Sequence, residues 1–270
     1  MKQPKKRNLL LFAVALLLTA CFSVVLLVAT GAVLLPEEWF DGREPSFSQA
    51  ATSAENAISQ GEPHQKQVRL RVRNILQRPE LPNGCEATAL AVVLQYLGYP
   101  ADKMELAYTY LPREDFYPTQ WGVRAGPDPH QAYPGDPGVE DGGYYCYPAP
   151  VVSGANHYLQ TAGGSHTAMD ISGADEDALL SLLQAGLPLM VWKTTDNTPP
   201  KSRADVAWLL PDGQLYEPIT NLHVVVLTGY DEESFYYCDP LEGSTRLDRE
   251  VFMTNYEQAG GYVVAFAHTE

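Results

Sequence analysis

Three side chains of types that can act together in thiol chemistry occur along the chain: Cys85, His223 and Asp239. A cysteine that attacks a substrate needs a base to accept its proton and a third group to orient that base. Of the six histidines, His223 starts a strongly apolar run, and Asp239 follows it by 16 positions. The residue types and their order predict Cys85 as nucleophile, His223 as base and Asp239 as the orienting group.

A fourth candidate, Gln77, precedes Cys85 by eight residues across a proline-rich turn. Its side-chain amide is expected to donate to an oxyanion, beside the backbone N–H of Cys85. The catalytic candidates also have ordinary structural explanations. Most cysteines at helix starts are small buried residues, a histidine in a strand is more often a satisfied core residue, and Asp-Pro is a common turn. The joint occurrence of the cysteine, histidine and aspartate in this order favours the catalytic interpretation.

A helix is predicted to begin at Cys85 and to end at Gly98. Its apolar residues follow one helix face, at Leu90, Val93, Leu94 and Leu97, and Ala87, Ala89, Ala91 and Val92 widen that surface. A helix with so broad an apolar surface should be central in the core. Free N–H groups in its first turn favour an anion, and with a cationic partner they can lower a thiol pKa from ~8.5 to ~3.5–7.5. Glu86 suits the positive end of the helix dipole.

A hairpin is expected to carry the other two catalytic candidates. Residues 222–230 and 235–239 form two strand-like runs, separated by the polar turn 231–234. His223 lies on the first run and Asp239 ends the second. A hairpin brings both within reach of each other, although its register does not follow from the sequence.

The remaining elements indicate an α+β domain with a helical part first and a mostly antiparallel sheet second. Residues 112–150 are crowded with proline, glycine and aromatic residues and form a long segment, which is expected to be functional or tightly packed. Asp175 can cap a helix that Gly186 ends. The other predicted elements are strands at 68–76, 187–195, 206–210, 215–219 and 262–267, and a helix at 248–259.

The N-terminal region differs from the rest of the chain. Residues 9–35 contain no charged side chain over 27 positions, whereas a membrane span needs ~20 apolar residues. The basic residues of 1–8 precede this run and acidic residues follow it, so the positive-inside rule places the N-terminus in the cytoplasm. We therefore predict a cytoplasmic segment 1–8, a single transmembrane signal anchor 9–35, a linker 36–67 and a domain 68–270 on the extracytoplasmic side of the cell membrane.

A lipoprotein is the alternative at the N-terminus. Residues 18–21 resemble a lipoprotein-processing box, in which Cys21 would become the lipidated first residue. The chain continues apolar to residue 35, where a lipoprotein normally becomes polar, and this favours the uncleaved anchor. Both alternatives leave the domain tethered outside the membrane.

The charge of the domain limits its partners. The chain carries 18 basic and 33 acidic side chains, and four of the basic ones precede residue 9, so the remainder has a net charge of −19. A surface of this sign repels nucleic acid and anionic membranes, and it favours basic peptides as binding partners.

The four cysteines raise the questions of metal binding and of a disulfide. They are scattered, and neither His-Glu-x-x-His nor Cys-x-x-Cys occurs, so a zinc site is not expected. In an oxidising compartment, Cys146 and Cys238 are expected to form a disulfide, the alternative being two separate buried thiols. Cys85 must stay reduced if it is the nucleophile. No cofactor is predicted.

Several of these motifs together resemble a known family. They are 81–86 around the cysteine, 135–137, 143–145, 191–192, 221–230 around the histidine, and 239–240. In this set the chain resembles the stand-alone bacterial relatives of the double-glycine leader peptidases, the thirty-ninth family of cysteine peptidases, over residues 68–270. The resemblance implies a papain-like cysteine peptidase fold, and it implies Cys85 as nucleophile, His223 as base, Asp239 as orienter and Gln77 as oxyanion donor.

The function expected from residues and resemblance is hydrolysis of peptide bonds through a thiol acyl-enzyme, with a peptide or protein as substrate. Two alternatives stay open. A Cys-His-Asp site also serves amidases and acyltransferases that act on cell-wall peptides. The domain could instead be a non-catalytic peptide-binding module of the same fold.

Overall fold

A computed structural model describes residues 64–269 of the chain. The predicted cytoplasmic segment, the predicted anchor 9–35 and most of the predicted linker lie outside these residues. Within 64–269, none of the helices has the length and apolar character that crossing a membrane requires.

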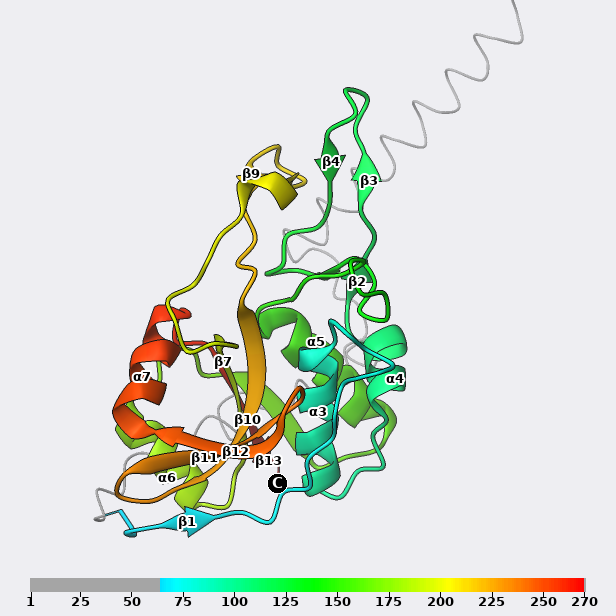
Figure 1. The fold of residues 1–270 in the computed structure, drawn as a ribbon. Helices are drawn as coiled ribbons and strands as arrows, with labels where there is room; N and C mark the ends of the chain where they lie inside the picture. The colour runs from blue at the N-terminus through cyan, green and yellow to red at the C-terminus, as the bar shows by residue number, and fades with distance from the viewer. Residues whose placement is uncertain (1–63, 270) are drawn as a thin grey trace, which may run out of the picture. The chain divides into compact units, whose positions relative to one another are not determined.

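The centre of the domain is a twisted antiparallel sheet with the strand order β12-β11-β10-β7-β13-β6 (Figure 1). In this order its strands are β12 (Gly243–Asp248), β11 (Ser234–Asp239), β10 (Leu222–Tyr230), β7 (Leu189–Thr194), β13 (Val263–His268) and β6 (His166–Asp170). A short strand β1 (Val68–Arg69) pairs with the end of β10. The predicted hairpin is therefore present as β10 and β11.

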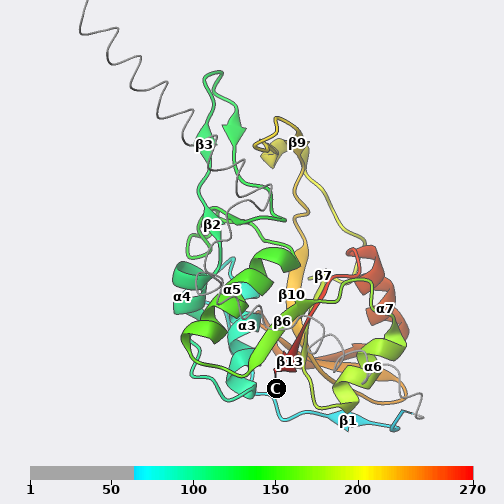
Figure 2. The same ribbon diagram turned by 180° about the vertical axis from the view of Figure 1, so that it is seen from behind.

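Helices cover both faces of this sheet, as the front and back views show (Figures 1 and 2). The helix α3 (Cys85–Tyr96) and the helix α5 (Pro148–Thr161) pack on one face, where Val224 and Val226 point. The helices α6 (Glu176–Gln184) and α7 (Arg249–Gln258) pack on the other, where Val225 and Leu227 point. Successive residues of a strand point to opposite faces, so a strand with both faces covered must be apolar throughout. This explains the apolar run at residues 224–227 of β10.

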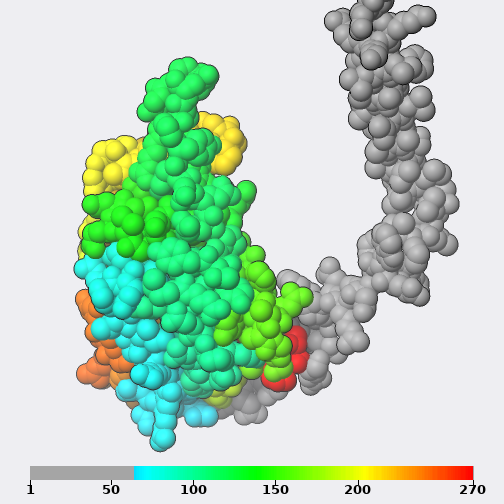
Figure 3. All heavy atoms as spheres, turned by 90° about the vertical axis from the view of Figure 1, so that its right-hand side faces the viewer, coloured from blue at the N-terminus to red at the C-terminus, as the bar shows by residue number. Residues whose placement is uncertain are grey.

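The stretch 112–150 is ordered and packed, as the sequence predicts. It contributes β2 (Arg113–Glu114), β3 (Tyr117–Pro118), β4 (Arg124–Ala125) and β5 (Tyr133–Pro134). The strands β3 and β4 join β8 (Trp208–Leu209) and β9 (Leu215–Tyr216) in a small sheet (Figure 1). This part of the chain projects from the domain, as the space-filling view shows (Figure 3). The buried Trp208 supports this arm and donates its indole N–H to Pro127 O at 2.9 Å.

Several elements differ from the prediction. The strand expected at 68–76 contains only the two residues of β1, and α5, β6, β12 and the short helices α4 (Lys103–Glu105) and η2 (Leu106–Tyr110) were not predicted. The helix α5 contains Pro148, Pro150 and Gly154, which oppose helix formation in isolation. Pro148 occupies the first turn, where proline is tolerated, and a side chain at Gly154 would come within 2.9 Å of Tyr110 O. Tertiary packing therefore sets this helix against its local propensity.

Candidate active site

Cys85 lies at the first position of α3, as predicted. The helix has Gly84 at its N-cap, without a side-chain cap, and a Cβ atom at Gly84 would lie 2.6 Å from the Leu81 Cβ. Glycine therefore allows the chain to turn tightly over Leu81 and enter the helix at the cysteine. The first ten residues of α3 are buried, and the Cys85 side chain belongs to the main core with 5% exposure.

His223 and Asp239 form a direct pair on β10 and β11. His223 Nε2 lies 2.8 Å from Asp239 Oδ1, and the two side chains are 3% and 9% exposed. The same Oδ1 atom accepts the backbone N–H of Leu241 at 2.8 Å. Burial acts to raise the pKa of Asp239, but the hydrogen bond and charge of His223 outweigh it and lower this pKa. The pair leaves Nδ1 of the imidazole available for a second partner.

The Cys85 sulfur is held by other groups in this structure. Its hydrogen-bond partner is Glu86 Oε2, at 3.4 Å, and the backbone of Val224, the residue after His223, lies near enough to influence its pKa. Within residues 64–269, no hydrogen bond joins the sulfur to the His223 ring. Burial and the charge of Glu86 raise the pKa of the thiol well above its usual value, although the Val224 backbone acts in the opposite direction. In this state burial therefore acts against the lowering of the thiol pKa that the helix start and a cationic partner would favour.

Glu86 is a functional candidate that the sequence analysis treated only as a helix-dipole residue. Its side chain has no solvent exposure, and Oε1 accepts the backbone N–H of Cys146 at 2.8 Å. Burial raises its pKa from 4.5 to about 7. The position beside the nucleophile was visible in the sequence, whereas the burial depends on the distant segment that contains Cys146.

Gln77 lies at the site, but in a different arrangement from a free oxyanion donor. Its Nε2 atom donates to Pro82 O at 2.6 Å, and its buried Oε1 has no partner among the described residues. Its backbone N–H donates to Pro240 O at 2.8 Å, which ties the chain before Cys85 to the turn after Asp239. A primary amide has two N–H donors, so one remains for a substrate.

A cavity of about 560 Å³ joins these residues. Cys85, His223 and Gln77 all line it, and Asp239 lies behind the histidine. The projecting arm contributes Arg124, whose guanidinium stacks 3.5 Å from the centre of the Phe116 ring. The structure thus brings three of the four predicted residues to one cavity and the fourth into contact with one of them.

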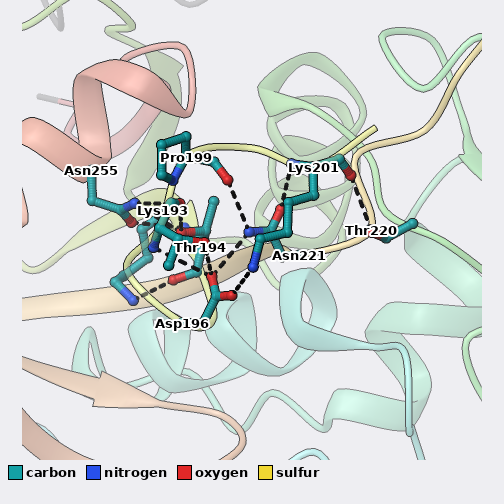
Figure 4. A network of polar contacts seen from close by, with 9 residues as sticks. Lys193, Thr194, Asp196, Pro199, Lys201, Thr220, Asn221 and Asn255 are labelled. Carbon is teal, nitrogen blue, oxygen red and sulfur yellow. Dashed lines mark hydrogen bonds and ion pairs between the residues drawn. The ribbon is translucent and has the colours of Figure 1, made fainter. Parts of the chain in front are cut away.

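A polar network supports the strand end that carries His223 (Figure 4). Asn221 Nδ2 donates to Asp196 Oδ1 at 3.0 Å, and Asn221 Oδ1 accepts the backbone N–H of Lys201 at 2.9 Å. Asn255 of α7 accepts the Thr194 N–H at 2.9 Å. Side-chain hydrogen bonds, first from Lys201 and then from Asn221, lower the pKa of Asp196, so it stays ionised. These polar residues hold the 194–201 loop beside the cavity, and no local pattern in the sequence indicates that they meet.

The predicted disulfide is absent: Cys85, Cys146 and Cys238 are all free. Cys146 lies next to Glu86, and its carbonyl accepts the indole N–H of Trp192 at 2.9 Å. The Cys238 sulfur lies instead 3.7 Å from the Ser244 hydroxyl. Each sulfur is buried in its own surroundings, and burial raises the pKa of both thiols. The alternative of two separate thiols is correct here.

Comparisons with known proteins agree with this geometry. The sequence model of the Peptidase_C39 like family matches residues 65–264. The uncharacterized protein YvpB of Bacillus subtilis (strain 168) is 32% identical over 193 residues, which cover 71% of this chain and 72% of the relative. The crystal structure of a putative C39-like peptidase from Bacillus anthracis is 31% identical, with a TM-score of 0.64, and the match covers 75% of this chain and 98% of the other.

The fold predicted from the resemblance is confirmed by these matches, in its α+β content and in its papain-like type. They also support a function of the cysteine peptidase kind. The chain belongs to the Peptidase_C39 like family.

Proposed function

We propose that the domain hydrolyses peptide bonds through a thiol acyl-enzyme, with Cys85 as nucleophile, His223 as base and Asp239 as orienting group. The observation that carries this proposal is the buried His223–Asp239 pair, 2.8 Å apart, at the cavity that Cys85 lines. A carboxylate on Nε2 fixes the tautomer that leaves Nδ1 free to accept a proton. A buried ion pair adds little net stability, and a titratable pair beside a cavity is typical of functional sites.

The reaction follows from these positions. The Cys85 S–H proton moves to His223 Nδ1, and the thiolate attacks the substrate carbonyl carbon. The carbonyl oxygen becomes an oxyanion, which the remaining Gln77 N–H and the Cys85 backbone N–H stabilise. His223 then returns the proton to the departing amine, which leaves an acyl group on the sulfur. Water, deprotonated by His223, releases the acid and restores the thiol.

The test is an adduct on Cys85. A thiol-directed, peptide-like electrophile should add its mass to Cys85 and not to Cys146 or Cys238, as measured by peptide mapping. His223→Ala should slow this labelling strongly, since it removes the base. If the electrophile labels the folded protein at other residues but leaves Cys85 unmodified, the proposal is wrong.

A substrate screen separates the alternatives that share this chemistry. Peptide libraries test the peptidase, and cell-wall fragments with added acyl acceptors test an amidase or acyltransferase. Binding of a peptide without turnover, in a protein whose Cys85 does not react, would support the non-catalytic module instead.

The location proposed for this activity is the extracytoplasmic side of the cell membrane, with residues 9–35 as the anchor. The support is the uncharged run and its basic leading flank. Protease added to intact cells or right-side-out vesicles should remove the region after Glu37. Full protection of that region without detergent would contradict the assignment, and a lipidated N-terminus at Cys21 would replace the anchor but keep the location.

A further inference from the structure

A carboxyl group without an ionic partner touches the nucleophile. Glu86 has no solvent exposure, and its Oε2 lies 3.4 Å from the Cys85 sulfur. Its other oxygen accepts the Cys146 N–H at 2.8 Å. Within residues 64–269, no lysine, arginine or histidine forms an ion pair with Glu86, whereas Asp239 has His223. The proposed mechanism gives this carboxyl no task.

The protonation state of Glu86 must affect the thiol. Two adjacent negative charges in a dry site strongly disfavour each other, so an ionised Glu86 opposes formation of the Cys85 thiolate. A protonated Glu86 has no such effect, and its O–H can donate a hydrogen bond to the thiolate. The same residue therefore either hinders or supports the nucleophile, depending on one proton.

The other titratable groups around Glu86 do not replace it in this role. They are Cys85 on α3, Cys146 before α5 and Tyr133 on β5, with His223 and Asp239 beyond the sulfur. Burial raises the pKa values of Tyr133 and Cys146 well above their usual values, so both stay neutral near pH 7. Asp239 has a lowered pKa and stays ionised. Burial places the pKa of Glu86 at about 7, inside the working range of most enzymes.

We propose that Glu86 is a further catalytic residue, which must be protonated for Cys85 to react and which therefore restricts the enzyme to the acid side of neutrality. This inference rests on the proposed function of Cys85. Glu86 keeps its proton throughout the step: the thiol proton passes to His223, and the Glu86 O–H only donates a hydrogen bond to the sulfur. Ionisation of Glu86 at higher pH removes this donor and adds an adjacent negative charge.

The experiment compares the wild-type protein with Glu86→Gln between about pH 5.5 and pH 8.5. The quantity measured is the rate at which iodoacetamide alkylates Cys85, followed by mass spectrometry of the Cys85 peptide. Glutamine keeps the size and the donor of the protonated acid but cannot ionise. The rate ratio of variant to wild type should be near one at acid pH and should rise roughly 10- to 100-fold through pH 7. Glu257→Gln, an exposed change on α7, should give a ratio that does not change with pH.

A role limited to holding the Cys146 segment against α3 predicts a different result. Loss of that contact would alter folding or the rate at all pH values, so a pH-independent ratio overturns the inference. If Glu86→Gln does not fold, the wild type itself gives the answer by infrared spectroscopy. One protonated carboxyl band should be present at about pH 6.5 and lost by about pH 8.5, and its absence at the lower pH would also overturn the inference.

The outcome separates this inference from the proposed function. A folded wild-type protein in which Cys85 is not alkylated at any pH contradicts the nucleophile and, with it, the role of Glu86. A reactive Cys85 with a flat ratio contradicts the role of Glu86 alone.

Discussion

Two buried carboxyl groups, one beside each catalytic partner, have opposite acidities. Asp239 contacts His223 at 2.8 Å and has a lowered pKa, whereas Glu86 contacts Cys85 at 3.4 Å and has a pKa raised to about 7. Burial acts in the same direction on both, since it penalises the charged form. The difference comes from the neighbours: His223, which can become a cation, lowers the pKa of Asp239, whereas the hydrogen bonds that Glu86 receives from Cys85 and Cys146 do not outweigh its burial.

The base and the nucleophile of the site therefore differ in how far they are prepared for the reaction. The base is already oriented by its carboxylate, while the nucleophile is held as a neutral thiol with Glu86 as its nearest polar partner. In the mechanism proposed above, the base and a protonated Glu86 both assist formation of the thiolate.

The largest effect is expected from removing either reacting group. Cys85→Ala and His223→Ala should each lower turnover by roughly 10⁴-fold or more, because no other side chain supplies the nucleophile or the base. The double variant should be scarcely worse than either single one, since the two act as a unit. Steady-state kinetics on a substrate from the screen measures this, and Cys238→Ala serves as the cysteine control that keeps turnover. Wild-type rates for folded Cys85→Ala would disprove the assignment.

A smaller loss of turnover should follow from disrupting the His223–Asp239 pair. Asp239→Asn removes the charge next to His223 and can reverse the imidazole tautomer, so turnover should fall by roughly 10²- to 10⁴-fold. Asp239→Ala should also leave measurable residual activity, because the nucleophile and base remain. If either variant were as inactive as Cys85→Ala, Asp239 would have a more direct part in the reaction than orientation.

The two carboxyl groups should change the stability of the fold in opposite directions as the pH rises. Glu86 has a folded pKa of about 7 against 4.5 for the free group, so the penalty for ionising it appears as the pH rises through this interval. The wild type should lose about 3 kcal/mol relative to Glu86→Gln between about pH 4.5 and pH 8. Asp239 has the opposite sign: its lowered pKa stabilises the fold above its unfolded pKa, and this is lost as the pH falls through the folded value. Urea unfolding of the wild type and of Glu86→Gln at several pH values measures the difference, and parallel curves would contradict the burial of a carboxyl group without an ionic partner.

The smallest effect is expected at Gln77. One of its donors is already used by Pro82 O, and the Cys85 backbone N–H remains, so Gln77→Ala should lower kcat by roughly tenfold to a hundredfold with little change in KM. Gln131→Ala, an exposed glutamine, is the matched control. A change confined to KM would mean that Gln77 binds the substrate and does not stabilise the oxyanion.

Much of the fold could be predicted from local patterns. The helix from Cys85 follows from the apolar spacing between two helix-terminating segments. The hairpin of β10 and β11 follows from two apolar runs around a polar turn. Elements without a local signal were missed. The helix α5 contains two prolines and a glycine, and the polar edge strand β12 has alternate residues in solvent, so packing rather than propensity defines both.

The catalytic residue types, their order and the elements that carry Cys85, His223 and Asp239 could all be predicted from the order of amino acids alone. Two features follow only from the folded arrangement: Asp239 contacts Nε2 of the His223 ring, and the backbone of Cys146, 60 residues away in the chain, hydrogen-bonds to Glu86. The reason is physical: the acidity of a side chain depends on burial and on the charges within a few ångströms. Both are set by segments that meet only when the chain folds, so the chemical state of Cys85 and Glu86 could not follow from their positions in the sequence.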